Sequence, residues 1–392
     1  MSVFDELVGQ RKVVELLRDA VTGTGMTHAW LFTGPPGSGR SVAARAFAAA
    51  LQCTASEPGC GVCAGCHTVL AGTHADVEFV RPQGLSLGVR EARELVGRAA
   101  LAPSGRRWHI IVIEDADRLT EGAANVLLKA IEEPTPRTVW LLCVPSAEDL
   151  VVTIRSRCRV VALRTPPTDA VAAVLVSRDG VEPALAEFAA RAAAGHVGRA
   201  KRLATDAVAR ERRTSVLRIP PSLTDIGACL SAADVLVKAV TDEAAEHTSS
   251  LDEAETASLK EAFGEGGTAT GLGRGQSGSA VTRGAARAAA SALKELEGRQ
   301  KSRATRAARD ALDRALTDLA GFYRDVLVLQ LGAGVDIANA DHAQTITSLA
   351  NSSTAESTLR RLDAILACRT LLDANANQLL AVESLMLSLR AG

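Results

Sequence analysis

Aromatic side chains are scarce in this 392-residue chain, and neither sign of charge is in surplus. With aromatics at only 3%, the hydrophobic cores have to be built from alanine, leucine and valine, which favours helical packing. The formal net charge of −1 excludes a strong overall attraction to nucleic acid. Any contact with DNA would therefore be local or shared with partner chains.

The sequence also lacks the hydrophobic segments that membranes and secretion require. No run of 18 apolar residues is present, and the acidic start at residues 1–6 has no apolar signal region. We therefore expect no membrane span and a cytoplasmic location. Thiols stay reduced there, so the 8 cysteines are expected to be metal ligands or buried apolar groups rather than disulfides.

Apolar runs and helical runs alternate along residues 1–165. Continuous apolar strands between helices are typical of a parallel sheet covered on both faces, so we predict an α/β domain over this range. The expected strands are residues 28–33, 77–80, 108–113, 138–143 and 159–163.

The remainder of the chain has helical patterns only. Residues 166–215 predict a small helical domain in three pieces, broken at Gly180 and at residues 195–198. Residues 216–392 predict a second helical domain with longer helices. A glycine-rich stretch at about residues 264–284 interrupts it, and its composition predicts a flexible insertion.

A glycine-rich turn follows the first predicted strand and matches the phosphate-binding loop G-x-x-x-x-G-K-[ST] at all positions but one. Gly34, Gly37 and Gly39 let backbone N–H groups surround an anion at a helix N-terminus. Ser41 is placed to hold Mg²⁺. Arg40 stands where the lysine belongs, and its broad planar guanidinium differs in reach from a slim ammonium group. The sequence predicts a nucleotide-binding scaffold and leaves open whether ATP and Mg²⁺ occupy it.

Two acids close the strand expected at residues 108–113. In P-loop NTPases the usual order there is Asp-Glu, in which the first acid orients Mg²⁺ and the second activates the attacking water. Here the order is swapped, with Glu114 before Asp115. An aspartate used as the base is one methylene group shorter, and proton transfer tolerates little such misplacement. The plainer interpretation, an acidic turn at a strand end, stays open for Asp117.

A cysteine cluster follows the helix expected after the glycine-rich loop. Cys53, Cys60, Cys63 and Cys66 form the pattern C-x6-C-x2-C-x2-C. Two-residue gaps let neighbouring thiolates converge on one ion, so the cluster predicts a closed, structural zinc site. An iron–sulfur cluster and reduced thiols without metal are the two other interpretations. The isolated cysteines, expected to be buried, are Cys143, Cys158, Cys229 and Cys368.

Further motifs are spread over about residues 4–165. They are Phe4, Val8-Gly9-Gln10, the run from His28 to Gly34, the run from Asn125 to Pro134, and Ser156-Arg157-Cys158. Together they resemble the bacterial clamp-loader subunits of the AAA+ class, whose gamma/tau and delta-prime members carry a zinc insertion after the P-loop helix. The resemblance implies a RecA-like P-loop core, a helical lid and an all-α collar domain for oligomerisation.

Within that family, the altered nucleotide site resembles the delta-prime type, in an actinobacterial version. The resemblance expects a sensor hydroxyl where this chain offers only Ser146, and a second sensor arginine where it has Gly198 followed by Arg199. The implied function is that of a largely non-hydrolysing subunit of the clamp loader of DNA polymerase III. The implied partners are gamma/tau and delta subunits in a hetero-oligomer and, through them, the sliding clamp and primed DNA.

The resemblance gives Arg157 a role as a trans arginine finger that reaches a neighbouring subunit's ATP. The plainer interpretation is a solvated arginine at a helix C-terminus. Two alternative functions stay open, an active gamma/tau-type ATPase and a zinc-containing nucleic-acid-binding module. A weaker hypothesis places Arg90, Arg93 and Arg98 against a DNA backbone.

Overall fold

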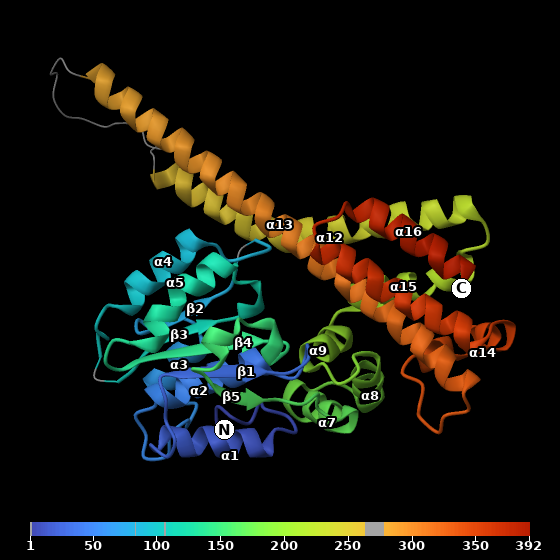
Figure 1. Cartoon of the computed structure of the whole chain (residues 1–392), viewed down its shortest axis with the longest axis horizontal. Helices are drawn as coiled ribbons and strands as arrows, with labels where there is room; N and C mark the ends of the chain where they lie inside the picture. The colour runs from blue at the N-terminus through green and yellow to red at the C-terminus, as the bar shows by residue number, and fades with distance from the viewer. Residues whose placement is uncertain (1, 83, 106, 263–277) are drawn as a thin grey trace. The chain divides into compact units, whose positions relative to one another are not determined.

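The computed structural model describes residues 2–82, 84–105, 107–262 and 278–392 (Figure 1). It divides into two compact units. The first unit comprises residues 1–82 and 86–210, and the second comprises residues 83–85 and 211–392. Each unit has its own hydrophobic core. Among the described residues, no helix is both long and apolar enough to span a membrane.

The first unit is built on a five-stranded parallel sheet with strand order β2-β3-β4-β1-β5. The register pairs Leu31 with Leu142 and with Val160, and Ile111 with Trp140. The predicted strands are confirmed to within one or two residues at each end. The observed strands are β1 (Ala29–Thr33), β2 (Val77–Val80), β3 (His109–Ile113), β4 (Thr138–Val144) and β5 (Arg159–Ala162).

Helices cover both faces of the sheet because successive side chains of each buried strand point to opposite sides. Trp30 and Phe32 pack in one core, whereas Leu31 packs in the other. Figure 1 shows the two helical layers. The first layer contains α1 (Arg11–Val21), α2 (Arg40–Gln52) and α3 (Ala64–Leu70). The second contains α4 (Val89–Ala99), α5 (Glu121–Glu132) and α6 (Val152–Arg155).

A small helical bundle follows the sheet and has a core of its own. Its helices are α7 (Thr168–Asp179), α8 (Pro183–Ala192) and α9 (Val197–Thr205), with α10 (Ala207–Leu217) next along the chain. The expected break at Gly180 is present, but the third predicted piece is two helices. They are separated at Asp206, whose carboxylate accepts a hydrogen bond from Val208 N–H at 2.9 Å.

The second unit is helical in its described residues and is dominated by two long helices. These are α12 (Ile226–Ala262) and α13 (Gly278–Gln330), and the shorter ones are α11 (Ile219–Ser222), α14 (Ala343–Ser352), α15 (Ala355–Asp373) and α16 (Gln378–Ala391). The insertion expected at residues 264–284 is helical from Gly278 onward, and its earlier part lies in residues 263–277, outside the described residues.

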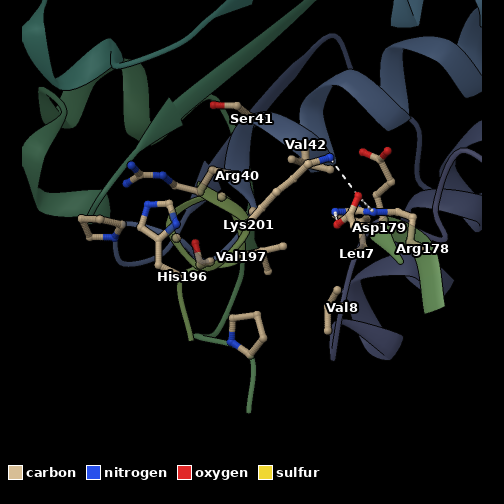
Figure 2. Close-up of a pocket in the computed structure, with 17 residues that line it drawn as sticks. Leu7, Val8, Arg40, Ser41, Val42, Arg178, Asp179, His196, Val197 and Lys201 are labelled. Atoms are coloured by element: carbon tan, nitrogen blue, oxygen red, sulfur yellow. Dashed lines mark hydrogen bonds and ion pairs between the residues drawn. The ribbon is translucent and has the colours of Figure 1, made fainter. Parts of the chain in front are cut away.

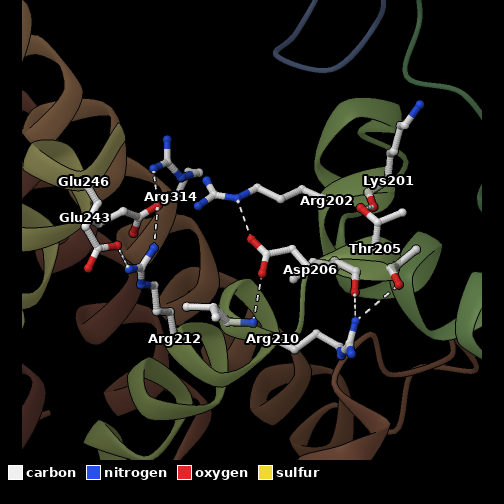
Figure 3. A network of polar contacts seen from close by, with 12 residues as sticks. Lys201, Arg202, Thr205, Asp206, Arg210, Arg212, Glu243, Glu246 and Arg314 are labelled. Carbon is white, nitrogen blue, oxygen red and sulfur yellow. Dashed lines mark hydrogen bonds and ion pairs between the residues drawn. The ribbon is translucent and has the colours of Figure 1, made fainter. Parts of the chain in front are cut away.

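The two long helices run antiparallel and are joined by ion pairs and hydrogen bonds. Arg303 contacts Asp252 at 2.7 Å, and Arg314 contacts Glu243 at 2.8 Å, so positions further along α13 meet earlier positions on α12. Arg212 adds contacts to Glu246 at 2.5 Å and to Glu243 at 3.9 Å (Figure 3). Charged contacts thus join the two long helices alongside buried apolar residues such as Ala244 and Leu312.

Candidate functional site

The glycine-rich loop lies between β1 and α2, at the carboxyl end of the sheet. Gly37 and Gly39 have φ angles of 86° and 93°, a region that favours glycine. Helix α2 begins at Arg40 and has no side-chain cap at its N-terminus. Gln10 contacts the loop: its Nε2 donates a hydrogen bond to the carbonyl of Ser38 at 3.2 Å. The loop therefore keeps the geometry of an anion-binding turn at a helix start.

A cavity of about 590 Å³ opens in front of this loop. One wall is residues 36–42, a second is the N-terminal segment Glu6–Val8, and a third comes from the lid helices (Figure 2). On the lid side, Lys201 Nζ lies 2.8 Å from Asp179 Oδ1, and Arg178 contacts the same carboxylate at 2.8 Å. The volume suits a nucleotide-sized ligand.

His196 brings the lid into direct contact with the loop. A Cβ placed on Gly37 would lie only 2.4 Å from His196 Cγ and 2.7 Å from its Cα. The His196 Nδ1 atom caps α9 by accepting from the N–H of Arg199 at 3.2 Å. Burial, reinforced by the charge of Arg199, holds the pKa of His196 below its ordinary value. A neutral imidazole is therefore packed against the phosphate-binding turn.

Arg40 turns back onto its own loop. Its guanidinium donates to the carbonyl of Gly34 at 2.8 Å, and Figure 2 shows its side chain lying beside His196. Ser41, Gly37 and Gly39 also line the cavity. The cation expected to reach a ligand's phosphates is thus engaged in an internal hydrogen bond.

The two acids at the end of β3 are not among the described residues that line the cavity. Glu114 is buried, and both of its carboxylate oxygens face guanidinium groups. Asp115 has a φ of 54° and begins a short turn. Asp117 follows in that turn, where burial raises the pKa of its carboxyl group. Glu114, the acid that would orient a metal, is therefore already paired with arginines of the protein.

The cysteine cluster has the geometry of a metal site. The sulfur atoms of Cys53, Cys60, Cys63 and Cys66 all lie within 4.8 Å of one another. Cys53 Sγ is 3.6 Å from Cys60 Sγ and 3.8 Å from Cys63 Sγ. Four thiolates about 2.3 Å from one tetrahedral ion would be about 3.8 Å apart. The donor set therefore fits a four-coordinate ion, and the cluster could bind a metal.

Backbone groups support the cluster. Burial acts to raise the pKa of the Cys63 thiol, but the backbone N–H groups of Cys66 and Thr54 outweigh it and lower that pKa to about 5. Burial raises the pKa of the Cys66 thiol. Helix α3 lies so close to the end of α2 that a Cβ on Gly65 would be 2.2 Å from the carbonyl oxygen of Gln52. The cluster thus joins two packed helices.

Arg157 lies just after α6, on the surface of the first unit. Its guanidinium contacts Glu132 at 2.5 Å and donates to the carbonyl of Thr153 at 2.7 Å. The side chain is 39% exposed. This arrangement leaves Arg157 accessible while its orientation is fixed by an acid on α5.

Other predicted residues lie away from the cavity or have different partners. The hydroxyl of Ser146 donates to Glu148 instead of facing the loop. Gly198 lines the cavity. Arg98, placed in the DNA hypothesis, contacts Glu78 at 2.7 Å. The sequence analysis missed His196 and Lys201 as site residues. His196 directly precedes the helix Val197–Thr205, and this N-cap position is the one signal that could have identified it.

A parallel sheet with a phosphate-binding loop after β1 and a helical lid places the chain in the AAA+ P-loop class. The family model described as DNA polymerase III, delta subunit, matches residues 9–167, and its C-terminal counterpart matches residues 304–391. The chain belongs to the clamp-loader family of DNA polymerase III.

Curated relatives agree with this assignment. The chain is 33% identical to DNA polymerase III subunit tau of Bacillus subtilis over 40% of its own length and 28% of the relative's. It is 30% identical to subunit delta' of the same organism over 54% of its own length and 64% of the relative's. The chain thus spans between 28% and 64% of the length of these curated relatives.

Among solved structures, a DNA polymerase III gamma subunit-related protein from Thermotoga maritima aligns over 97% of this chain and 98% of its own. The TM-score is 0.39 and the sequence identity is 14%, a likeness that carries no detail of the site.

Proposed function

We propose that this chain is a non-hydrolysing clamp-loader subunit of delta-prime type. It would assemble with gamma/tau and delta subunits in the cytoplasm and help load the sliding clamp onto primed DNA for DNA polymerase III. The observation that carries this proposal is the pairing of Glu114 with Arg45 and Arg81, which engages the acid that would orient the metal. Hydrolysis requires the metal, the base and the γ-phosphate to meet within hydrogen-bond distance. The internal bond of Arg40 supports the same conclusion.

In this proposal Arg157 acts on a neighbour's ATP as a trans arginine finger. A planar guanidinium suits the oxygens of a transferring phosphoryl group. The contact with Glu132 supports the role, because an exposed ion pair has little net stability and can be exchanged for a phosphate. We infer that Glu132 keeps the finger in place until the neighbour binds ATP.

The three-domain division at residues 1–165, 166–215 and 216–392 belongs to this proposal, with the last domain as an oligomerisation collar. Exposed leucines on the last two helices support a protein-binding face there. They are Leu359 and Leu366 on α15, and Leu380 and Leu387 on α16. We also propose that the metal of the cysteine cluster is a structural Zn²⁺, because four thiolates leave no open coordination position.

The test is Arg157→Ala in a reconstituted clamp loader in which only the neighbouring ATP site that would face this chain remains active. We expect ATP turnover at that site to fall by about 10³-fold or more, as for other arginine fingers. Arg155→Ala, which removes a nearby arginine at the end of α6, is the matched control and should leave turnover within about twofold.

Unchanged turnover in the Arg157→Ala complex would overturn the finger assignment. The rival function, an active ATPase of gamma/tau type, is favoured by relatives that carry that name. It predicts that this chain hydrolyses ATP when every partner site is inactivated. Such turnover would overturn the non-hydrolysing role.

A further inference from the structure

Glu114 occupies the position from which an acid orients Mg²⁺ in P-loop NTPases, but guanidinium groups surround it. Its Oε2 accepts from Arg81 Nε at 2.9 Å, and its Oε1 lies 3.7 Å from Arg45. The Glu114 side chain is only 5% exposed. Both oxygens of a buried carboxylate therefore already face positive charge.

Arg45 is held in this position by its surroundings. Its guanidinium lies over the ring of Phe79, 4.3 Å from the ring centre, and donates to the carbonyl of Leu70 at 3.2 Å. Arg45 belongs to α2, the helix that begins at the phosphate-binding loop, and Phe79 belongs to β2. The packing of α2 against the sheet thus places the positive charge of Arg45 beside Glu114.

These residues do not fit a bound Mg²⁺. A divalent cation would have to displace guanidinium groups from a buried carboxylate, which removes charge-assisted hydrogen bonds. It would also be placed close to the guanidinium of Arg45, which is packed over Phe79, and close to that of Arg81, and both repel a cation. Arg45 and Arg81 therefore take the place that a metal ion would have beside Glu114.

The phosphate-binding turn keeps its backbone conformation, although Arg40 donates to the carbonyl of Gly34. Helix α2 has an uncapped N-terminus at the cavity. Ser38, which lines the cavity, is only 2% exposed, and its hydroxyl has no hydrogen-bond partner. A buried hydroxyl without a partner costs free energy unless a ligand satisfies it. Among the described lining residues, the cations Arg40, Arg178 and Lys201 outnumber the acids Glu6 and Asp179.

We propose that this cavity binds a diphosphate-bearing ligand, such as a nucleoside diphosphate, without a divalent cation. The Arg45–Glu114–Arg81 cluster stands in place of the metal site, and the Ser38 hydroxyl and the start of α2 hold the phosphates. The inference rests on the proposed function, because it takes the cavity to be one that binds and does not hydrolyse. Such a ligand would fill the space between loop and lid as a permanent structural element.

The experiment is calorimetry of ADP binding to the full chain, once in EDTA and once with excess Mg²⁺. We expect dissociation constants that agree within about twofold, and Ser38→Ala should weaken binding about fivefold in both buffers because one hydrogen bond is lost. Inorganic pyrophosphate should displace ADP in EDTA. Binding at least tenfold tighter with Mg²⁺, no binding in either buffer, or failure of pyrophosphate to compete would each overturn the proposal.

A second variant tests the arginine cluster itself. Arg81→Gln frees one oxygen of Glu114, and we expect Mg²⁺ then to tighten ADP binding at least fivefold. Arg81→Lys keeps the positive charge and should stay insensitive to Mg²⁺, as should the control Arg98→Gln, which breaks the separate contact with Glu78. An Arg81→Gln protein that melts like the wild type and is still insensitive to Mg²⁺ would contradict the role of the cluster.

The two proposals can fail separately. Mg²⁺-dependent binding of ADP without ATP turnover would overturn the inference and leave the non-hydrolysing role standing. ATP turnover by the chain, with its partners' sites inactivated, would overturn the proposed function.

Discussion

The cysteine cluster and the nucleotide cavity are both formed by ligand-binding motifs of the first unit. They differ in whether the donor groups of the motif face a common point or contact other groups of the protein. In the cluster, four sulfur atoms lie within 4.8 Å of one another and can face a single ion. In the nucleotide-binding motifs, the charged groups bind partners within the protein: Arg40 donates to the carbonyl of Gly34, and Glu114 is paired with Arg45 and Arg81. The four cysteines, which form a complete donor set, lie close enough together to bind one ion. The altered charged residues of the nucleotide motifs bind groups of the protein itself instead.

The physical reason for this difference is the cost of unpaired charge. A cysteine packed without a metal costs little where its thiol is neutral, since a neutral thiol is a small apolar group. A buried carboxylate without a cation costs far more. Once Glu114 no longer serves a metal, a fixed positive charge nearby is strongly favoured, and Arg45 and Arg81 supply it.

The cysteine half of the comparison gives the largest expected effect. Cys60→Ser should remove one equivalent of metal and lower the free energy of unfolding of the first unit by several kcal/mol, because the free energy of binding a structural metal is also folding free energy. Metal content by mass spectrometry and a thermal melt measure this. Cys158→Ala, a cysteine outside the cluster, should keep the metal. A Cys60→Ser protein with full metal content would contradict the closed four-thiolate site.

The second-largest expected effect is a loss of stability when the contact between the phosphate-binding loop and His196 of the lid is disturbed. Gly37→Ala should destabilise the first unit by about 1–2 kcal/mol from its left-handed backbone alone. The free energy of unfolding of the Gly37→Ala protein should fall by about 1–3 kcal/mol more, because the added Cβ would overlap His196. Gly39→Ala is the matched control, with a similar φ but only Leu7 nearby, at 3.9 Å.

Chemical denaturation of the two variants measures the difference between them. Adding His196→Ala to Gly37→Ala should recover most of the excess loss, since the overlapping side chain is then shortened. Equal stability of Gly37→Ala and Gly39→Ala would show that the lid does not rest on the loop.

The strands and the cysteine cluster could be predicted from the sequence because their signals are local. Buried parallel strands such as His109–Ile113 are continuous apolar runs, and the four cysteines lie close together along the chain. The partners of Glu114 could not be predicted, because they come from other elements. Arg45 meets Glu114 only when α2 packs on the sheet, and Arg81 meets it only when β2 pairs with β3. The same holds for Lys201 and Asp179 across the lid.

The His196 contact also predicts a dependence on pH. Burial holds the pKa of His196 below its ordinary value of 6.5, so at intermediate pH the unfolded chain binds the extra proton and the folded chain does not. The stability of the first unit should therefore be full above pH 6.5 and fall as the pH drops below it. His196→Asn can still cap α9 and cannot titrate, so this part of the pH dependence should disappear. A wild-type protein whose melting temperature rises as the pH falls below 6.5 would contradict the buried neutral imidazole.

The smallest expected effect comes from restoring the motif itself. Arg40→Lys completes the loop sequence, yet we expect ATP affinity to rise by no more than about fivefold, because a lysine gains a favourable phosphate contact but no metal joins it. ATP turnover should stay at background, since Glu114 remains paired with arginines and the order of the two acids remains swapped. Arg40→Gln, which removes the charge and keeps an N–H donor on a shorter side chain, is the control and should weaken binding. Calorimetry and a phosphate-release assay distinguish the outcomes: a lysine variant that turns over ATP would mean that the loop alone, and not the arginine-bound acid, disables the site.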